Sequence, residues 1–306
     1  MGYYRQTSLQ KNLQLRARII QTIRNFFIDN DYLEVETPVR IPAPAPEAHI
    51  DAVESEDWFL QTSPELCMKR LLAAGIPRIF QICKCFRYGE RGRLHLPEMT
   101  LLEWYRTDSN YQDIMKECEA LIGTVARKVG LEDSVVYQSK KIKLTPPWPR
   151  IPVRDAFDKF GSITLKTALE QDQFDDILVA EIEPNLGQTQ PVFLYDYPAS
   201  RGALARLKPQ DPRYAERFEL YIGGLEICNA FSELTDPVEQ RARFEREQDH
   251  RRESGKSEYP MPEKFLTALD DLPEAAGNAL GIDRLIMLFA DSMQIDAVVA
   301  FTPEEL

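Results

Sequence analysis

The sequence predicts an α+β fold, an antiparallel sheet flanked by helices, in a single domain spanning residues 1–306. Strand-like segments in the later half follow one another through tight turns rather than through regular βαβ units. The dipeptide Gly223-Gly224 separates two of these segments and is a two-residue hairpin signal. A hydrophobic content of 43% and a charged content of 28% are typical of a globular protein.

The first elements are marked by their boundary residues. Apolar residues recur at helical spacing over 8–29 and predict an amphipathic helix. Residues 32–37 are β-like, and Pro38 ends them. A second helix begins at Ser63-Pro64-Glu65, with serine as the N-cap and proline in the first helical position, and it ends at Gly75.

The remaining elements are predicted from hydrophobic pattern and glycine punctuation. In chain order they are strands at 79–83 and 98–105 around a polar loop, a helix at 111–130, strands at 192–197 and 218–231, and a glycine-containing segment at 277–281 that leads into a last helix at 282–290.

Composition narrows the function classes. Five cysteines at irregular spacing, without a C-x-x-C pair, predict reduced thiols rather than zinc ligands. A net charge of −12 argues against a protein that grips nucleic acid phosphates, and the basic stretch 241–256 is interleaved with acids, as on a solvated helix face. No apolar run approaches the roughly 20 residues of a membrane helix, and the N-terminus resembles no secretory signal, so a cytoplasmic protein is expected.

A carboxylate and a phenol share one face of the strand 98–105. Period-two alternation puts Glu103 and Tyr105 on the same face as Leu101, with Leu102 and Trp104 on the other. A lone buried charge is costly, so Glu103 needs a partner. An ammonium ligand would satisfy it, and an internal arginine or lysine would do so equally well.

A second acidic cluster lies in an apolar stretch. Glu226, Asn229 and Glu233 are typical of a cation or Mg²⁺ site, because Mg²⁺ prefers carboxylate oxygens. The two glutamates are seven positions apart, which puts them on opposite faces of a regular strand. A shared site therefore requires a bulge, or a strand that ends before Glu233.

The third cluster suits an anion. Glycines over 277–281 allow close backbone approach, and Arg284 lies in the first turn of the helix that follows, where phosphate binds well. Taken alone this signal is weak, since glycine before a helix is usually a turn.

In this order the clusters resemble the three signature motifs of class II aminoacyl-tRNA synthetases, most closely the lysyl-tRNA synthetase branch. Residues 26–38 look like motif 1, which builds the dimer interface, residues 86–103 look like motif 2, and residues 277–284 look like motif 3. The resemblance runs from about Arg5 to the end and implies an antiparallel class II sheet, ATP as a substrate, Mg²⁺ and a homodimer.

Motif 1 begins almost at once, without the anticodon-binding domain of full lysyl-tRNA synthetases. The chain thus resembles the elongation factor P lysine ligase family, which attaches β-lysine to a lysine of that translation factor. Residues 62–65, 68–72 and 102–106 look like this family. So does Ala279, where lysyl-tRNA synthetases have glycine. The resemblance implies lysine or β-lysine as the substrate and elongation factor P as the acceptor.

The resemblance also implies residue roles. Arg87 and Arg284 would be catalytic and hold ATP phosphates. The nucleotide site would add Tyr88, Gly89, Glu90, His95, Leu96, Glu226, Ile227 and Gly281. The amino acid site would comprise Ser63, Pro64, Glu65, Glu103, Tyr105, Asn229, Glu233 and Ala279. Glu226 and Glu233 are the expected Mg²⁺ ligands.

Two departures from the family pattern fall in the nucleotide loop. Tyr88-Gly89 stands where Asn-Glu is usual, and Leu96 stands where asparagine is usual. They leave open how adenine is held. Two other functions compete with the protein ligase: a minimal synthetase acting on tRNA, which the charge and the absent module oppose, and a non-catalytic regulator, which only Tyr88-Gly89 favours.

Overall fold

The computed structural model describes residues 4–202 and 204–306. The α-helices are α1 (Arg5–Asp29), α2 (Glu65–Ala73), α3 (Tyr111–Val129), α4 (Val153–Phe160), α5 (Leu165–Glu170), α6 (Phe174–Ile177), α7 (Pro237–Glu253), α8 (Glu263–Ala268) and α9 (Ile282–Phe289). The main-sheet strands are β1 (Leu33–Glu34), β5 (Arg78–Phe86), β6 (Glu98–Thr107), β9 (Arg150–Pro152), β10 (Val192–Pro198), β11 (Leu207–Lys208), β12 (Asp211–Ile222), β13 (Leu225–Ser232) and β14 (Ala275–Gly281). Smaller sheets are built from β2 (Arg40–Ile41), β3 (Glu54–Ser55) and β4 (Trp58–Leu60), and from β7 (Ser134–Tyr137) and β8 (Lys140–Lys143).

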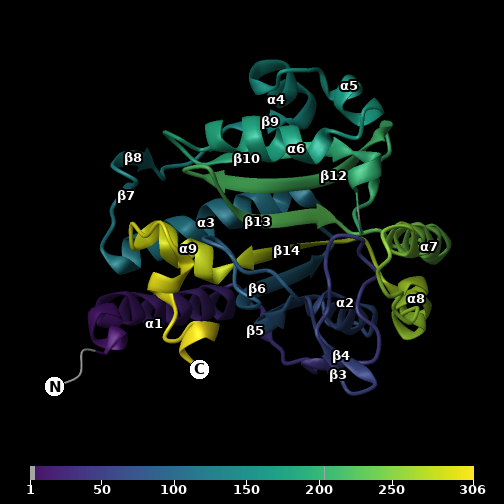
Figure 1. Cartoon of the computed structure of the whole chain (residues 1–306), viewed down its shortest axis with the longest axis horizontal. Coiled ribbons are helices and arrows are strands. Elements are labelled where there is room, and N and C mark those ends of the chain that lie inside the picture. Colours follow the sequence, from purple (N-terminus) through teal and green to yellow (C-terminus); the bar gives the residue numbers. More distant parts are fainter. Residues whose placement is uncertain (1–3, 203) are drawn as a thin grey trace.

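The predicted α+β class is confirmed. The main sheet runs β1-β5-β6-β14-β13-β12-β10-β9, with β11 paired to β12, and only the β1–β5 and β10–β9 pairs are parallel. Figure 1 shows helices on both sides of this sheet, with α4 to α6 beyond one edge and α7 and α8 beside the strand ends. The predicted hairpin is present at Gly223-Gly224, where both glycines have positive φ, as a tight β-turn of this kind requires.

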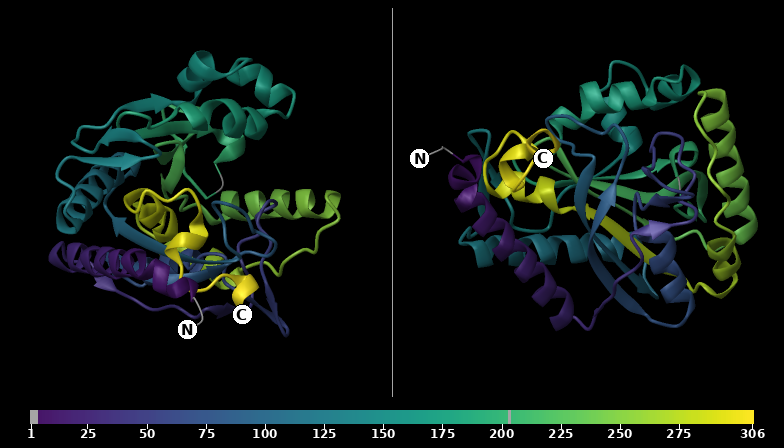
Figure 2. Two further views of the ribbon diagram at one scale, coloured as in Figure 1. Left: turned by 60° about the vertical axis from the view of Figure 1, so that its left-hand side comes forward. Right: turned by 60° about the horizontal axis from the view of Figure 1, so that its bottom comes forward.

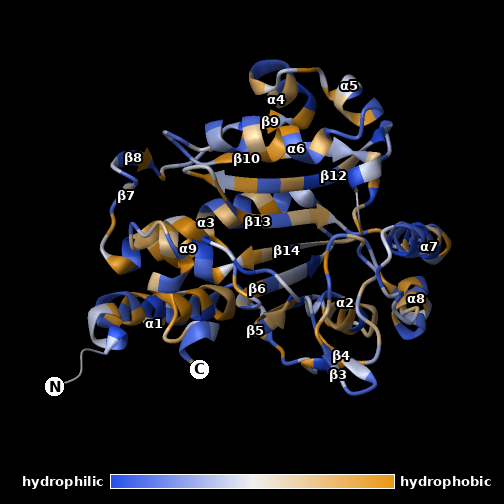
Figure 3. Cartoon of the chain, viewed as in Figure 1, coloured by the Kyte–Doolittle hydropathy of each residue, from blue (hydrophilic) through white to orange (hydrophobic). Residues whose placement is uncertain are grey.

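One face of the sheet packs on helices. Leu102 and Trp104 of β6 join residues of α1, α3 and α9 in the largest apolar cluster, and Figure 3 shows hydrophobic stretches on α1 and α9 beside the sheet. Asn110 caps α3 through a capping box, and Gly130 follows in the left-handed conformation. The predicted helix 111–130 is therefore confirmed to within one residue.

Three predicted boundaries differ from the structure. Residues 277–281, expected to lead into the last helix, form most of the strand β14 between β6 and β13. Glycine and alanine weaken the sequence signal of a strand, and here the neighbouring strands supply the pairing. The β-like stretch 32–37 is reduced to the two residues of β1. Helix α2 starts at Glu65, with Pro64 before it, so Ser63 lies one position further out than predicted.

The stretch 241–256 is not simply a solvated face. On α7 the side chains of Arg243, Gln248 and Arg251 are buried, and Arg251 is 2% exposed. Its guanidinium donates to the backbone oxygens of Glu47 and Ile50. One side of α7 therefore holds the segment between β2 and β3 in place.

The two ends of the described chain meet. Arg5, at the start of α1, pairs with Glu305 at 2.5 Å, and Figure 2 shows the N-terminal helix beside the C-terminal segment. Residues 1–3, included in the predicted domain 1–306, lie outside the described residues. No helix within the described ranges is long and apolar enough to cross a membrane.

Candidate active site

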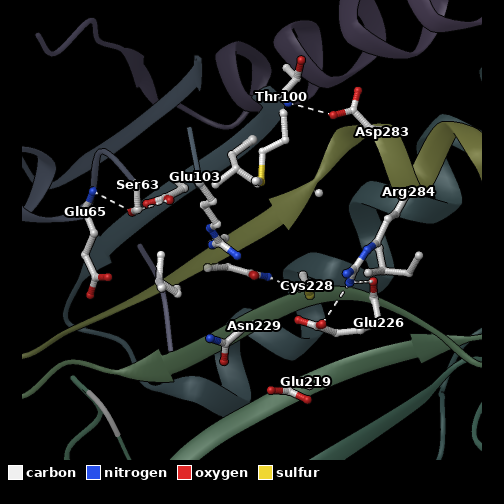
Figure 4. Close-up of a pocket in the computed structure, with 18 of the residues that line it drawn as sticks. Ser63, Glu65, Thr100, Glu103, Glu219, Glu226, Cys228, Asn229, Asp283 and Arg284 are labelled. Carbon is white, nitrogen blue, oxygen red and sulfur yellow. Dashed lines mark hydrogen bonds and ion pairs between the residues drawn. The ribbon is translucent and has the colours of Figure 1, made fainter. Parts of the chain in front are cut away.

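A cavity of about 290 Å³ lies on the face of the main sheet opposite α3. Leu101, Glu103 and Tyr105 of β6 line it, whereas the alternate residues Leu102 and Trp104 pack into the apolar core. The predicted alternation of this strand is therefore confirmed. Figure 4 shows Ser63 and Glu103 at one end of the cavity and Glu226 and Arg284 at the other.

Glu103 is fully buried, yet hydroxyl groups supply its hydrogen bonds. Ser63 Oγ donates to Oε1 and Tyr105 Oη to Oε2, each at 2.7 Å. Ser63 Oγ also accepts the backbone N–H of Glu65 at the start of α2. Within the described residues Glu103 forms no ion pair, and burial raises the pKa of its carboxyl to about 7. A buried carboxylate without an ion pair is suited to bind a cationic group of a ligand.

The β-bulge that a shared site was predicted to require is present in β13, but it brings Glu226 together with Asn229 and not with Glu233. Leu220 pairs with Cys228 and Tyr221 pairs with Glu226, so Ile227 is an extra residue on β13. Glu226 and Asn229, three positions apart, consequently both line the cavity. The strand also ends at Ser232, before Glu233.

Glu233 does not share the surroundings of Glu226. It is 1% exposed, is not among the cavity-lining residues and forms an ion pair with Lys69, which is itself 1% exposed. Lys69 also pairs with Glu65 at 2.5 Å, and the two carboxylates raise the pKa of Lys69 against the effect of burial. For Glu233 the internal partner is therefore a lysine of α2, and its proposed pairing with Glu226 around Mg²⁺ has no support in this geometry.

Gly277 forms the floor between these groups. A Cβ at this position would lie 2.2 Å from Tyr105 Cδ1 and 2.7 Å from Glu233 Oε1. Only glycine leaves room for the phenol and the carboxylate at this point of β14. This explains a glycine inside a central strand.

The two arginines of the predicted phosphate site line the same cavity. Arg284, in the first turn of α9, donates to Glu226 Oε2 at 2.9 Å and lies 2.5 Å from His95 Nε2. Burial alone would raise the pKa of Glu226, but Arg284, together with Arg217 and Arg87, outweighs burial and lowers that pKa. The Nε of Arg87 is buried without a hydrogen-bond partner in the described part of the chain. An anion would satisfy it.

Most of the other predicted residues also line the cavity. Those that do are Ser63, Glu65, Glu90, His95, Leu96, Ile227, Ala279 and Gly281. Pro64, Tyr88 and Gly89 do not; Pro64 precedes α2, and the Tyr88 side chain is 71% exposed. The unusual dipeptide Tyr88-Gly89 therefore does not line the cavity, whereas Leu96, the other departure, does.

Two cavity residues on β12 were missed by sequence reasoning. Arg217 donates to Glu219 Oε1 at 2.5 Å and to Asn229 Oδ1 at 2.9 Å. Tyr197 and Tyr221 both donate to Glu219 Oε2 at 2.6 Å. The available signal was the alternation of Arg217, Glu219 and Tyr221 with the apolar residues Phe218 and Leu220, since alternation places the three polar side chains on one face.

The carboxylates of Glu219 and Glu226 face the same cavity from adjacent strands. Burial raises the pKa of Glu219, although Arg217 opposes the shift. The described residues contain no group of three or more His, Cys, Asp or Glu arranged to hold a metal. Two carboxylates suit a Mg²⁺ ion that takes its remaining ligands from substrate phosphates.

This fold and site define a class II synthetase catalytic domain: the chain matches the family described as tRNA synthetases class II (D, K and N) over residues 1–305. Within it, the chain belongs to the elongation factor P–(R)-β-lysine ligase family. It is 40% identical to the elongation factor P–(R)-β-lysine ligase of Vibrio cholerae serotype O1 over 312 residues, covering 96% of each chain. Identity to the ligase of the same name from Erwinia tasmaniensis is 39%, covering 95% of this chain and 94% of the relative.

Proposed function

We propose that this enzyme activates (R)-β-lysine or lysine with ATP as an aminoacyl-adenylate and transfers it to a lysine side chain of elongation factor P. The observation that carries the proposal is one cavity lined by Glu103 and Tyr105 and by Arg87 and Arg284. Figure 4 shows Glu103 and Arg284 at opposite ends of it. One end suits an ammonium group and the other a triphosphate, so an amino acid between them would direct its carboxylate at phosphorus.

Activation then requires positioning and charge stabilisation. The amino acid carboxylate attacks the α-phosphorus of ATP, and pyrophosphate leaves with the electron pair of the broken P–O bond. Arg87 and Arg284 stabilise the charge on the phosphate oxygens. Glu103 and Tyr105 hold the distal ammonium, with Asn229 beside it, and Glu65 takes the amino group near the reacting carboxylate. This alignment supplies much of the acceleration.

We propose Glu226 and Glu219 as the protein ligands of Mg²⁺, in place of the pair Glu226 and Glu233. When bound with ATP, the ion would neutralise phosphate charge. Glu233 keeps a role in the amino acid site, because with Lys69 it supports Glu65 and the floor at Gly277.

Ala279 is proposed to tune the amino acid preference. On β14 it pairs with Glu103 on one side and Asn229 on the other, so its methyl group lies between two residues of the amine site. We predict that Ala279→Gly improves the use of α-lysine relative to (R)-β-lysine in ATP–pyrophosphate exchange. An unaltered preference would show that this methyl group does not set specificity.

The acceptor is tested directly. Purified enzyme, ATP and (R)-β-lysine are incubated with unmodified elongation factor P or with tRNA, and the products are analysed by mass spectrometry. A mass increase of one lysyl residue on the protein and none on tRNA is expected; the converse would favour a minimal synthetase. No pyrophosphate exchange with α-lysine, (R)-β-lysine or other amino acids would indicate a regulator.

We further propose that the enzyme is cytoplasmic, where this acceptor works, and that it is a homodimer.

A further inference from the structure

Glu47 is a cavity residue to which the activation chemistry gives no task. It belongs to the segment between β2 and β3 and lines the cavity, and Arg87 and Glu65 are among the charged groups that act on its carboxyl. Arg87 is proposed to bind phosphate, and Glu65 lies with the amino acid. Glu47 therefore lies near the place where the acyl–phosphate bond of the adenylate would be.

The backbone around Glu47 is held by α7 and by Lys256, which follows that helix. Arg251 donates to the Glu47 oxygen at 2.9 Å and pairs with Asp51 at 3.0 Å. The Ala48 N–H donates to Glu247 Oε2 at 2.8 Å, and the Ala48 oxygen accepts from Lys256 Nζ at 2.9 Å. Such anchoring on both sides fixes where the carboxylate can reach.

The Glu47 carboxylate itself is uncommitted. Across residues 4–202 and 204–306 it forms no hydrogen bond or ion pair, whereas Glu65, Glu103 and Glu233 all have side-chain partners. The charged groups facing it are Arg87, Glu65 of α2, Glu247 of α7 and Arg217 of β12. Burial raises the pKa of Glu47 to about 7, with Arg87 opposing and the two glutamates adding to the shift.

We propose that Glu47 is the general base of the transfer step, accepting a proton from the ε-ammonium of the incoming lysine. This inference rests on the proposed function, because the reaction needs an amine that arrives protonated. Glu47 takes the proton, the neutral nitrogen attacks the acyl carbon, and the carbon–oxygen bond to phosphate breaks. AMP leaves with that electron pair. The second proton lost from the new amide nitrogen passes to solvent.

The other acids of the cavity are less suited to this task. Glu103 and Glu65 are occupied by the amino acid or by Lys69. His95 lies against Arg284 on the nucleotide side, where burial and that guanidinium lower its pKa. Of the cavity acids, Glu47 combines proximity to Arg87 with a free carboxylate.

The test separates the two half-reactions in Glu47→Gln. The rate of adenylate formation, measured by pyrophosphate exchange, is expected to stay within about twofold of the wild-type rate. The rate of single-turnover transfer to elongation factor P should fall about 100-fold, the usual contribution of a general base. The wild-type transfer rate should level off above about pH 7, while that of Glu47→Gln keeps rising with pH because only free amine reacts. Glu54→Gln, which changes an exposed carboxylate in β3 at the end of this segment, is the matched control.

A second nucleophile distinguishes a base from a structural role. Hydroxylamine is neutral near pH 7, so its reaction with the adenylate should be equal in wild type and Glu47→Gln. The proposal would be overturned if Glu47→Gln transferred the amino acid at the wild-type rate or with the wild-type pH profile. It would also be overturned if this variant lost the hydroxylamine reaction or adenylate formation to the same extent as transfer. If wild type fails to modify elongation factor P, the proposed acceptor is wrong. In that case the transfer rates of wild type and Glu47→Gln are compared with an Nα-blocked lysine amide as the nucleophile, and this comparison still decides the role of Glu47.

Discussion

At the scale of single residues, the partner of each buried glutamate decides what it can do. Glu233 has its cation inside the protein, in Lys69, and is thereby a structural charge. Within the described part of the chain, the side chain of Glu103 is bonded only to the hydroxyls of Ser63 and Tyr105, so it retains a charge to offer a ligand. The sequence left open whether an ammonium ligand or an internal cation would partner Glu103; the internal lysine instead pairs with Glu233, for which a metal or cation site was expected.

The state of Glu103 predicts how amino acid binding depends on pH. Its carboxyl has a pKa of about 7 in the free enzyme and must be ionised to hold an ammonium group. Because the pKa of Glu103 is raised, protons compete with the ammonium group of the ligand for this carboxylate when the pH is below about 7. Affinity for (R)-β-lysine should therefore fall about tenfold between pH 8 and pH 6, with proton release on binding at the lower pH.

Titration calorimetry in buffers of different ionisation enthalpy measures both quantities. Glu103→Gln should bind weakly and without this pH dependence, whereas Glu98→Gln, at the exposed start of the same strand, should behave as wild type. A wild-type affinity that does not change between pH 6 and pH 8 would contradict the assignment.

The site residues that could be predicted from the sequence are those marked by a pattern within one strand. The alternation in β6 predicted that Glu103 and Tyr105 share a face. A site shared by Glu226 and Glu233 was predicted to require a bulge or an early strand end; β13 has both features, yet Glu226 lines the cavity with Asn229 and without Glu233. Sequence reasoning could not find the Lys69–Glu233 pair, because no local pattern joins α2 to the end of β13. Arg217 and Glu219 were overlooked for a related reason: they become site residues only when β12 lies beside β13.

At the scale of elements, Asp283 joins three of them. From the first turn of α9 it pairs with Arg16 of α1 at 2.5 Å and accepts the Thr100 N–H of β6 at 2.8 Å. An acidic residue also suits a helix N-terminus. The neighbouring Arg284 is therefore positioned by a helix whose start is fixed to the sheet (Figure 4).

Removing this carboxylate should loosen all three elements. We predict that Asp283→Ala lowers the free energy of unfolding by about 3 kcal/mol, because it leaves the largely buried Arg16 without its counter-charge. Urea denaturation measures the change. Asp270→Ala, at an exposed position, should stay within about 0.5 kcal/mol of wild type, and an equal effect of the two substitutions would show that the Arg16 pair contributes little.

At the scale of the whole molecule, one edge of the sheet is left open. Strand β1 is the last in the order, and Leu33 on it is 53% exposed. Ile28, at the end of α1, is 55% exposed close by in the chain. An exposed edge with apolar side chains invites a partner, and the resemblance of this region to motif 1 points to a second copy.

We therefore expect a dimer at micromolar concentration that Ile28→Glu combined with Leu33→Glu converts to a monomer. Sedimentation velocity is the measurement, because it reports mass without immobilising the protein. Val238→Glu, which alters an exposed apolar residue of α7, should leave the dimer intact. A monomeric wild type, or a double variant that sediments as a dimer, would show that this edge is not the interface.

The extra residue in β13 has a further consequence. Along a strand, odd and even positions belong to opposite sides, and Ile227 changes that parity midway. A chain shortened by this one residue would keep its composition and motifs but turn either Glu226 or Asn229 into the core. When relatives are aligned, a one-residue gap at this point of β13 thus matters more than many substitutions. It decides whether the residues before or after the gap face the cavity.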